Sequence, residues 1–199
     1  MSSQSAAELS QLVQAGAEQM VSALRRAAGP DGLDVGELTD LLKVAFTDRN
    51  RIDAAVTTAI GALDRAAEKD DLEPTMALPT STWLSCQLNI SSSSAHAQVQ
   101  LARRLPGLPG TAAAFERGEL SGHHAGVVAR AVESVLRGGG SAGDAEILLL
   151  QEARRRDPRD LLRYGLSLLH QLAPREMEAE EDRRRQRRYV HLTELFDGG

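Results

Sequence analysis

Hydrogen-bonding side chains gather between Trp83 and Leu105, where the sequence predicts a helix, a three-residue turn and a second helix. Asn89-Ile90-Ser91 ends the first helix, because Asn and Ser favour turns and helix N-caps over helix interiors. The order of helix, turn and helix is that of the motifs that lay their second helix on DNA. Such a helix would direct polar side chains outward, toward a groove or a phosphate: Ser92, Ser93, His96, Gln100 and Arg103.

Two short helices that merely pack into an α-helical bundle would show the same pattern. Leu84 and Leu88 are expected to face inward on the first helix, and Asn89 suits the left-handed turn conformation. A helix-turn-helix also needs an inward apolar residue near Gln98, whereas the apolar residue here is Val99. Packing without DNA contact therefore stays open as the alternative interpretation.

The adjacent pair His123-His124 is a second place where side chains could do chemistry. Neighbouring residues on a helix point about 100° apart, so this pair lacks the i, i+4 spacing of a zinc-binding pair. A capping or interior hydrogen bond is therefore favoured for His124. Cys86 is expected to be a small core residue, because the sequence places no base beside it. With no phosphate-binding loop or nucleophile motif in the chain, we expect no catalytic residue, no metal site and no cofactor.

An arginine-rich run from Arg183 to Arg188 is the third candidate. Arg184 and Arg187 could contact phosphates and give salt-dependent binding to DNA. The acidic run from Glu178 to Asp182 stands directly before them and could pair with them at i, i+4. The run is thus either a phosphate contact or a solvated helix face with its own ion pairs.

Long helices precede these candidates. Apolar residues recur at helical spacing from Ser5 to Ala28, and Gly29-Pro30-Asp31-Gly32 ends that helix. A second helix opens at Val35, after a capping box formed by Asp34 and Glu37, and runs to about residue 69. Two long helices with apolar stripes suggest an antiparallel pair or the seam of a homodimer.

Five further helices and one strand are expected in the second half of the chain. The helices are Thr111–Arg117 followed by Gly118, one capped by Ser121, Ala142–Arg156 with Ile147, Leu148 and Leu150 buried, one opened by Asp157-Pro158, and one that starts at Pro174. The alternating run from Tyr189 to Gly199 predicts a strand. Since a single strand cannot complete its ladder of hydrogen bonds, its partner is expected after Gly199.

Composition supports one helical domain. Aromatic residues make up only 3% of the 199 residues, and Ala, Leu and Arg dominate, as in helical layers. The predicted fold class is an all-α, multi-helix bundle with two long N-terminal helices, a helix-turn-helix-like centre and a short C-terminal β-strand. One Cys and the lack of an apolar run of about 20 residues predict a cytoplasmic protein without a membrane span.

Charge is distributed unevenly along the chain. The net charge is −5, and the first 79 residues hold 13 of the 28 acidic residues but only 7 of the 23 basic ones. The remaining residues are close to neutral, which leaves local contact with a nucleic acid possible.

The central stretch also carries motifs that are typical of one family. The residues are Ala95, Leu101-Ala102-Arg103, Leu105-Pro106, Leu108-Pro109, Thr111, Gly118, Ser121, His124-Ala125, Asp157-Pro158, Leu161, Arg184 to Arg188 and Asp197-Gly198. With these residues the chain resembles the 13E12-repeat family, catalogued as a domain of unknown function (DUF 222), over roughly Leu38 to Gly199. Ser121 and His124 belong to the signature of that family.

The resemblance implies a role beside a nuclease, because a zinc-binding HNH endonuclease domain commonly follows in that family. We accordingly expect an N-terminal helix and turn over residues 1–34, the family-like helical domain over 35–199, and an HNH domain after residue 199 of a longer parent protein. The chain would then be a DNA-interacting accessory domain without catalytic residues of its own. The alternative is a helical module for protein interaction or dimerisation that makes no contact with nucleic acid.

Overall fold

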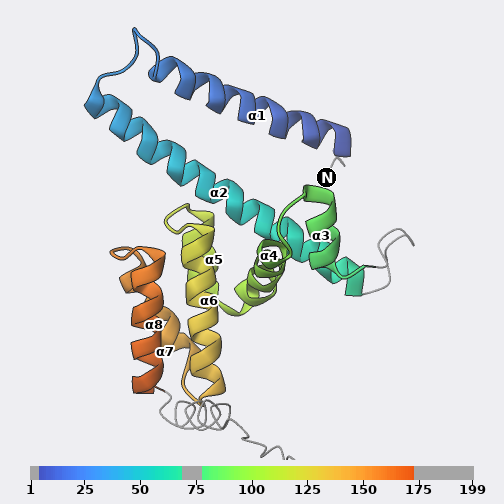
Figure 1. The fold of residues 1–199 in the computed structure, drawn as a ribbon, viewed down its shortest axis with the longest axis vertical. Helices are drawn as coiled ribbons and strands as arrows, with labels where there is room; N and C mark the ends of the chain where they lie inside the picture. The colour runs from blue at the N-terminus through green and yellow to red at the C-terminus, as the bar shows by residue number, and fades with distance from the viewer. Residues whose placement is uncertain (1–4, 69–77, 173–199) are drawn as a thin grey trace, which may run out of the picture.

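A computed structural model describes residues 5–68 and 78–172, and the long helices α1 and α2 form an arm that reaches away from a bundle of shorter helices (Figure 1). α1 and α2 meet at the turn between them and diverge from it. The described elements are α1 (Ala6–Ala27), α2 (Val35–Glu68), α3 (Thr80–Leu88), α4 (Ser92–Arg104), the 3₁₀ turn η2 (Leu105–Gly107), α5 (Pro109–Glu116), α6 (Gly122–Arg137), α7 (Ala142–Ala153) and α8 (Pro158–Leu172).

The predicted all-α, multi-helix bundle is confirmed, but the fold class that added a C-terminal β-strand is wrong. The described residues contain helices and no strand, so none of them offers the hydrogen-bonding partner that a strand requires. The segment for which the sequence predicts the strand, residues 189–199, lies outside the described ranges.

Local capping fixes the start of both arm helices. The Ser5 hydroxyl accepts the Glu8 backbone N–H while the Glu8 carboxylate accepts the Ser5 N–H, and Asp34 and Glu37 repeat this exchange before α2. Each reciprocal pair satisfies donors that the first turn of a helix leaves free. The predicted capping box at Asp34 and Glu37 is therefore confirmed, as are both predicted helices.

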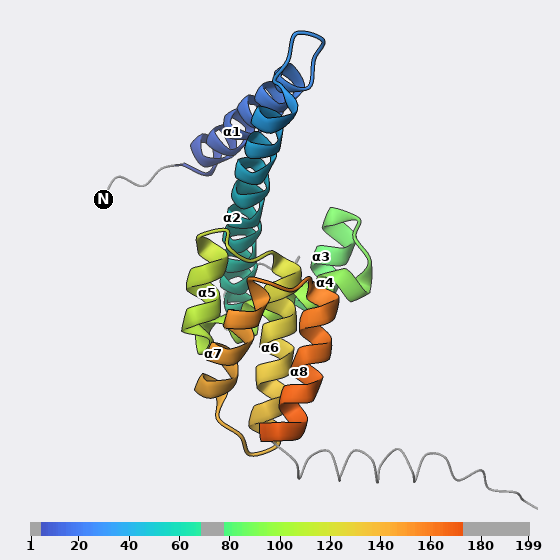
Figure 2. The same cartoon turned by 90° about the vertical axis from the view of Figure 1, so that its left-hand side faces the viewer.

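α6 lies at the centre of the bundle, with α8 on one side and α5 and α7 on the other (Figure 2). Its apolar residues recur at helical spacing, so one face of the helix is buried against these neighbours. Complete burial of each Val, Leu or Phe side chain in such a cluster stabilises the fold by about 1.5–3 kcal/mol. The most buried members of the cluster are Phe115, Leu120, Ala125, Val128, Ala129, Val132, Val135, Ala145, Leu149 and Leu161.

Gly118 joins the arm to the bundle. Its φ of +77° is the left-handed conformation predicted for a residue behind α5, and its carbonyl accepts the Asn50 side-chain N–H at 3.1 Å. A Cβ atom at this position would lie 2.4 Å from the Thr47 carbonyl oxygen. Only glycine therefore allows α2 to approach the end of α5 this closely.

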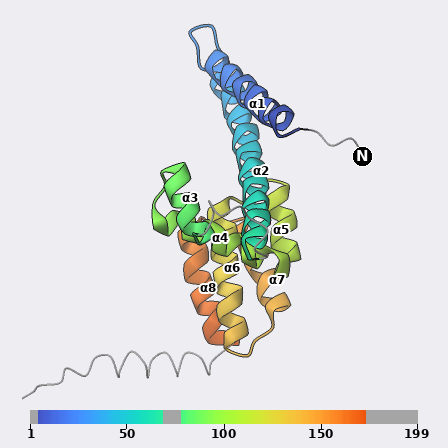
Figure 3. The ribbon, with the colours of Figure 1, turned by 90° about the vertical axis from the view of Figure 1, so that its right-hand side faces the viewer.

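α3 packs on the side of the bundle against α2 and α4 (Figure 3). Leu84 is buried there with Ile60, Ala95, Val99 and Ala102. The predictions that Leu88, Ile147 and Cys86 are buried are wrong, because Leu88 is 56% exposed, Ile147 is 57% exposed and the Cys86 thiol is exposed. Helical spacing gives the direction of each side chain, whereas the packing of α3 and α7 against their neighbours decides whether Leu88 and Ile147 are covered.

Candidate functional site

The predicted order of helix, three-residue turn and helix is confirmed by α3 and α4. Asn89 adopts φ +52° in the turn, and the Ser91 hydroxyl caps α4 by accepting the Ser94 backbone N–H at 3.1 Å. The Ser85 hydroxyl closes the turn by donating to the Ile90 carbonyl at 2.8 Å. Val99 is buried in α4 whereas Gln98 is half-buried, as the sequence indicates.

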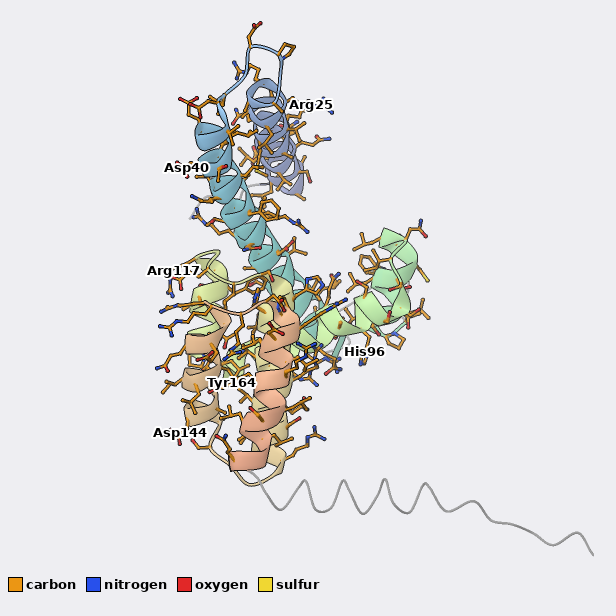
Figure 4. All side chains as sticks on the ribbon, turned by 60° about the vertical axis from the view of Figure 1, so that its left-hand side comes forward. Arg25, Asp40, His96, Arg117, Asp144 and Tyr164 are labelled. Atoms are coloured by element: carbon orange, nitrogen blue, oxygen red, sulfur yellow. The ribbon has the colours of Figure 1, made fainter. Side chains whose placement is uncertain are left out.

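The proposed DNA-contact residues of α4 differ in their surroundings. Ser92, Ser93 and His96 are exposed, and His96 lies on the part of α4 near α3 (Figure 4). Gln100 is half-buried. Arg103 is half-exposed but binds Asp64 of α2 with two hydrogen bonds, Nε to Oδ2 at 2.6 Å and Nη2 to Oδ1 at 2.9 Å.

The ion pair with Arg103 is a structural link between α2 and α4. The Asp64 side chain is only 4% exposed, and its hydrogen bonds with Arg103 and then Thr80 lower the pKa of the carboxyl below its ordinary value despite the opposing effect of burial. Arg104 pairs with Glu133 of α6 at 2.6 Å. Both arginines of α4 are thus bound to carboxylates, and α3 carries no charged residue, so this surface offers hydrogen bonds but little positive charge for phosphates.

The two remaining candidates for DNA contact, Arg184 and Arg187, lie outside the described residues. The interpretation of that run as a phosphate contact or as a face of internal ion pairs stays a prediction.

Ser121 and His124 connect three helices through hydrogen bonds. The Ser121 hydroxyl accepts the His124 backbone N–H at 3.3 Å as the N-cap of α6, and the same hydroxyl lies 2.8 Å from His124 Nδ1. His124 Nε2 lies 3.0 Å from the Arg156 carbonyl oxygen. Because a carbonyl only accepts, Nε2 donates to it. In the neutral form of the ring, Nδ1 is then the acceptor and the Ser121 hydroxyl is the donor. This geometry agrees with the predicted capping hydrogen bond of His124, while His123 is exposed.

The Arg156 carbonyl belongs to an arginine-rich end of the bundle, where α5, α7 and α8 have neighbouring ends. We define the arginine end as six arginines and four carboxylates: Arg117, Arg154, Arg155, Arg156, Arg159, Arg163, Glu119, Glu152, Asp157 and Asp160. Figure 4 labels Arg117, at the end of α5 beside α2. The sequence predictions did not include these arginines, although five of them stand within one short stretch around Asp157-Pro158.

Carboxylates hold four of the six guanidinium groups in place. Glu119 accepts Arg117 Nε at 2.5 Å on one oxygen and an Arg154 Nη2 at 3.1 Å on the other, so one carboxylate binds two arginines from different helices. Arg156 pairs with Glu152 and lies 5.3 Å from the ring centre of Tyr164, and Arg163 pairs with Asp160. The fourth carboxylate has a different role, because Asp157 accepts the backbone N–H groups of Arg159 and Asp160 and so begins α8.

The remaining two arginines of the cluster, Arg155 and Arg159, are exposed. No salt bridge within the described ranges involves their side chains, although the charge of Arg159 helps to lower the pKa of Asp157. The cluster therefore has more guanidinium groups than carboxylates to neutralise them.

Hydrogen bonds within the arginine end favour the ionised forms of its arginines and carboxylates. Arg117, and more weakly Arg154, lowers the pKa of the Glu119 carboxyl, and the backbone N–H groups of Asp160 and Arg159 lower the pKa of Asp157. Glu119 in turn raises the pKa of Arg117, and Glu152 raises the pKa of Arg156. The arginine end thus presents fixed charges and has an excess of two positive ones at neutral pH.

The described parts of the chain contain neither a cluster of metal-binding side chains nor a helix suited to cross a membrane. Residues 5–68 and 78–172 contain no group of three or more His, Cys, Asp or Glu side chains that could hold a metal ion. Among the helices of the same ranges, none combines the length and the apolar character required to cross a membrane.

Comparison with known proteins identifies the family but gives no activity. The model of a family described as a domain of unknown function (DUF222) matches residues 39–198. The matched range includes α3 to α8 and all but the first turn of α2. No curated protein and no solved structure matches the chain. The chain, which forms a helical bundle, belongs to the DUF222 family.

Proposed function

We propose that this chain is a non-catalytic accessory domain that contacts the phosphate backbone of DNA through its arginine end. The observation that carries the proposal is the excess of guanidinium groups there, with Arg155 and Arg159 exposed and unpaired with any described carboxylate. Arginine is suited to this task because its planar group forms paired hydrogen bonds with phosphate oxygens. Contacts of this kind supply affinity and orientation without reading the base sequence.

The shared carboxylate of Glu119 supports the proposal. It holds the side chains of Arg117 and Arg154, which are 55% and 64% exposed, so their conformations are restricted before any ligand arrives. A restricted side chain loses less conformational entropy on binding than a free one. The two guanidinium groups keep N–H donors that Glu119 does not use.

His124 supports the proposal as a positioning residue. Its hydrogen bond to the Arg156 carbonyl ties the backbone of the arginine-rich stretch to the start of α6. Because α6 is the central helix of the bundle, Arg155 and Arg156 are presented from a fixed support.

DNA reading by α4 remains part of the proposal as a secondary contact. Ser92, Ser93 and His96 could donate hydrogen bonds to DNA once the arginine end has bound the backbone. In a longer parent protein, an HNH nuclease domain would cut the DNA that this domain positions. The chain alone is then expected to leave plasmid DNA intact when Mg²⁺, Mn²⁺ or Zn²⁺ is added.

A titration of fluorescently labelled duplex DNA at several salt concentrations tests the proposal. Arg155→Ala/Arg159→Ala is expected to weaken binding and to lower the slope of log affinity against log salt by about 2, because two phosphate contacts are lost. Arg65→Ala/Arg130→Ala removes the same charge from exposed positions outside the arginine end and is the matched control. His96→Ala/Gln100→Ala tests the contact by α4.

The results of this titration distinguish DNA contact by the arginine end from DNA contact by α4. Equal weakening by the arginine-end pair and the control pair would reduce the effect to net charge and contradict the proposal. Loss of binding only with His96→Ala/Gln100→Ala would move the DNA contact to α4. Absence of binding by the wild type at low salt would contradict DNA contact and leave protein interaction through the arm as the function.

A further inference from the structure

The N-terminal half of α1 has an apolar face that nothing in the described chain covers. Leu9, Leu12 and Val13 are 49%, 60% and 75% exposed. Toward the other end of the helix, Met20 and Leu24 are half-buried and Ala27 is buried, because α1 meets α2 there (Figure 1). The two helices diverge from their connecting turn. α2 therefore covers the apolar face of α1 only near that turn, and the face continues uncovered toward the N-terminus.

This face is a single stripe. Leu9, Val13, Gly16, Met20 and Ala23 recur at alternating steps of four and three residues, which places them along one side of the helix. That spacing is typical of helices that pack lengthwise against another helix. The 22 residues of α1 are about 33 Å long at 1.5 Å per residue.

The charges beside the stripe indicate what covers it. Glu8 and Arg26 are 18 residues apart, which is five helical turns, so both lie on the same flank of α1. In an antiparallel pair with two-fold symmetry, residues on the same flank meet across the interface. An axis near Ala17 would place Glu8 of each copy opposite Arg26 of the other.

Both charged groups are available for this pairing. The Glu8 carboxylate binds the Ser5 backbone N–H through one oxygen, which leaves the other free to accept. No carboxylate of the described residues pairs with Arg26. The flank of α1 is therefore complementary to itself when one copy is reversed.

We infer that the partner of this surface is a second copy of the same chain, whose α1 packs antiparallel to the first with the two-fold axis near Ala17. The bare N-terminal half of each α1 then lies beside the hairpin end of the other arm. Gly16, where an added Cβ atom would meet nothing within 4 Å, lies near the crossing point and allows the two helices to approach closely. This association does not depend on the DNA contact proposed above, and the arginine-end variants should leave it unchanged.

Light scattering on the full chain tests whether the dimer forms through this face. The wild type is expected to have the mass of two chains, and Leu12→Glu/Val13→Glu is expected to raise the dimer dissociation constant about tenfold or more. Both residues are exposed, so folding should survive, with helicity measured by circular dichroism. Ile147→Glu/Leu166→Glu changes two equally exposed apolar residues of α7 and α8 and should leave the dimer intact.

Exchanging the two charges tests the pairing of Glu8 in one copy with Arg26 in the other. Glu8→Arg and Arg26→Glu are each expected to weaken the dimer, and the double variant should restore it. Because the double variant also lacks the Glu8 capping hydrogen bond, recovery cannot come from the helix end.

Disulfide formation tests the orientation, in a Cys86→Ser background that removes the exposed native thiol. Gly16→Cys should form a disulfide-linked dimer, whereas Leu9→Cys should not, since an antiparallel pair separates the two copies of position 9 by about 24 Å. Cross-linking of both variants would show a parallel pair and overturn the inferred orientation. A monomer at all concentrations, or a dimer that tolerates Leu12→Glu/Val13→Glu, would overturn the inference.

Discussion

His124 Nε2 donates to the Arg156 carbonyl at 3.0 Å, and this hydrogen bond joins the N-terminus of α6 to the connection between α7 and α8. The same ring accepts the Ser121 hydroxyl at Nδ1. The His124 side chain therefore bonds the capping hydroxyl of one helix and a carbonyl left free behind another. Ser121 and His124 thus link the start of α6 to the backbone of the arginine end.

His124→Ala is predicted to lower stability by about 1–2 kcal/mol, because it removes two side-chain hydrogen bonds. DNA binding should weaken as well, although no charge of the arginine end is removed. His124→Gln keeps a donor for the Arg156 carbonyl and should retain more of the binding. Denaturant unfolding and the DNA titration measure both effects. Equal binding by wild type and His124→Ala, with reduced stability, would limit His124 to a structural role.

Arg103→Ala is predicted to destabilise the chain by about 2–3 kcal/mol, because it leaves the Asp64 carboxylate buried without its main partner. Asp64→Ala/Arg103→Ala should recover part of this loss, since the unpaired charge is gone. Urea unfolding of both variants beside the wild type measures the difference. A larger loss in the double variant than in Arg103→Ala would contradict this account of the pair.

The pH dependence of stability follows from the same pair. The pKa of Asp64 is lower in the folded chain than its ordinary value, so the folded state favours the ionised carboxylate. The stabilisation from Asp64 is therefore present above its unfolded pKa and is lost as the pH falls through the lowered folded value. Asp64→Asn should flatten the acid side of the stability curve, measured as the urea midpoint between neutral and acidic pH. An unchanged curve would show that Asp64 contributes nothing to acid unfolding.

Gly118→Ala is predicted to cost about 2 kcal/mol or more, since it adds the strain of a positive φ and a clash with the Thr47 carbonyl. Gly139 is the matched control, because it has φ +84° but open space around its Cβ position. Gly139→Ala should cost only the conformational part, about 1 kcal/mol. Similar thermal midpoints for the two variants would mean that α2 does not press against Gly118.

Thr111→Val is predicted to cost about 1.5–3 kcal/mol, because the buried Glu146 carboxylate loses the hydroxyl that donates to it at 2.8 Å. Glu146 also accepts the Thr111 backbone N–H at 2.7 Å and so binds the start of α5 from α7. Glu146→Gln retains an accepting oxygen and should cost less. The opposite order of the two unfolding free energies would exclude the hydroxyl as the main contact.

Helix boundaries could be predicted from the amino-acid sequence alone. Asp34 with Glu37, and Ser121, cap the helices that their positions predict, and Ser5 with Glu8 forms a capping box of the same kind. Caps and breakers act between residues that are neighbours along the chain, so their effect can be read without knowing the fold. Asn89 likewise adopts the left-handed turn that its type favours.

The faces that are covered, and the polar groups that meet, depend instead on how the helices pack. Arg103 binds a carboxylate 39 residues away, and His124 binds a carbonyl 32 residues away, so neither partner follows from local spacing. Leu88 and Ile147 are apolar but 56% and 57% exposed, because the described helices leave their positions uncovered. A helical period specifies the direction of each side chain relative to its own axis, whereas burial and pairing require the relative placement of separate helices.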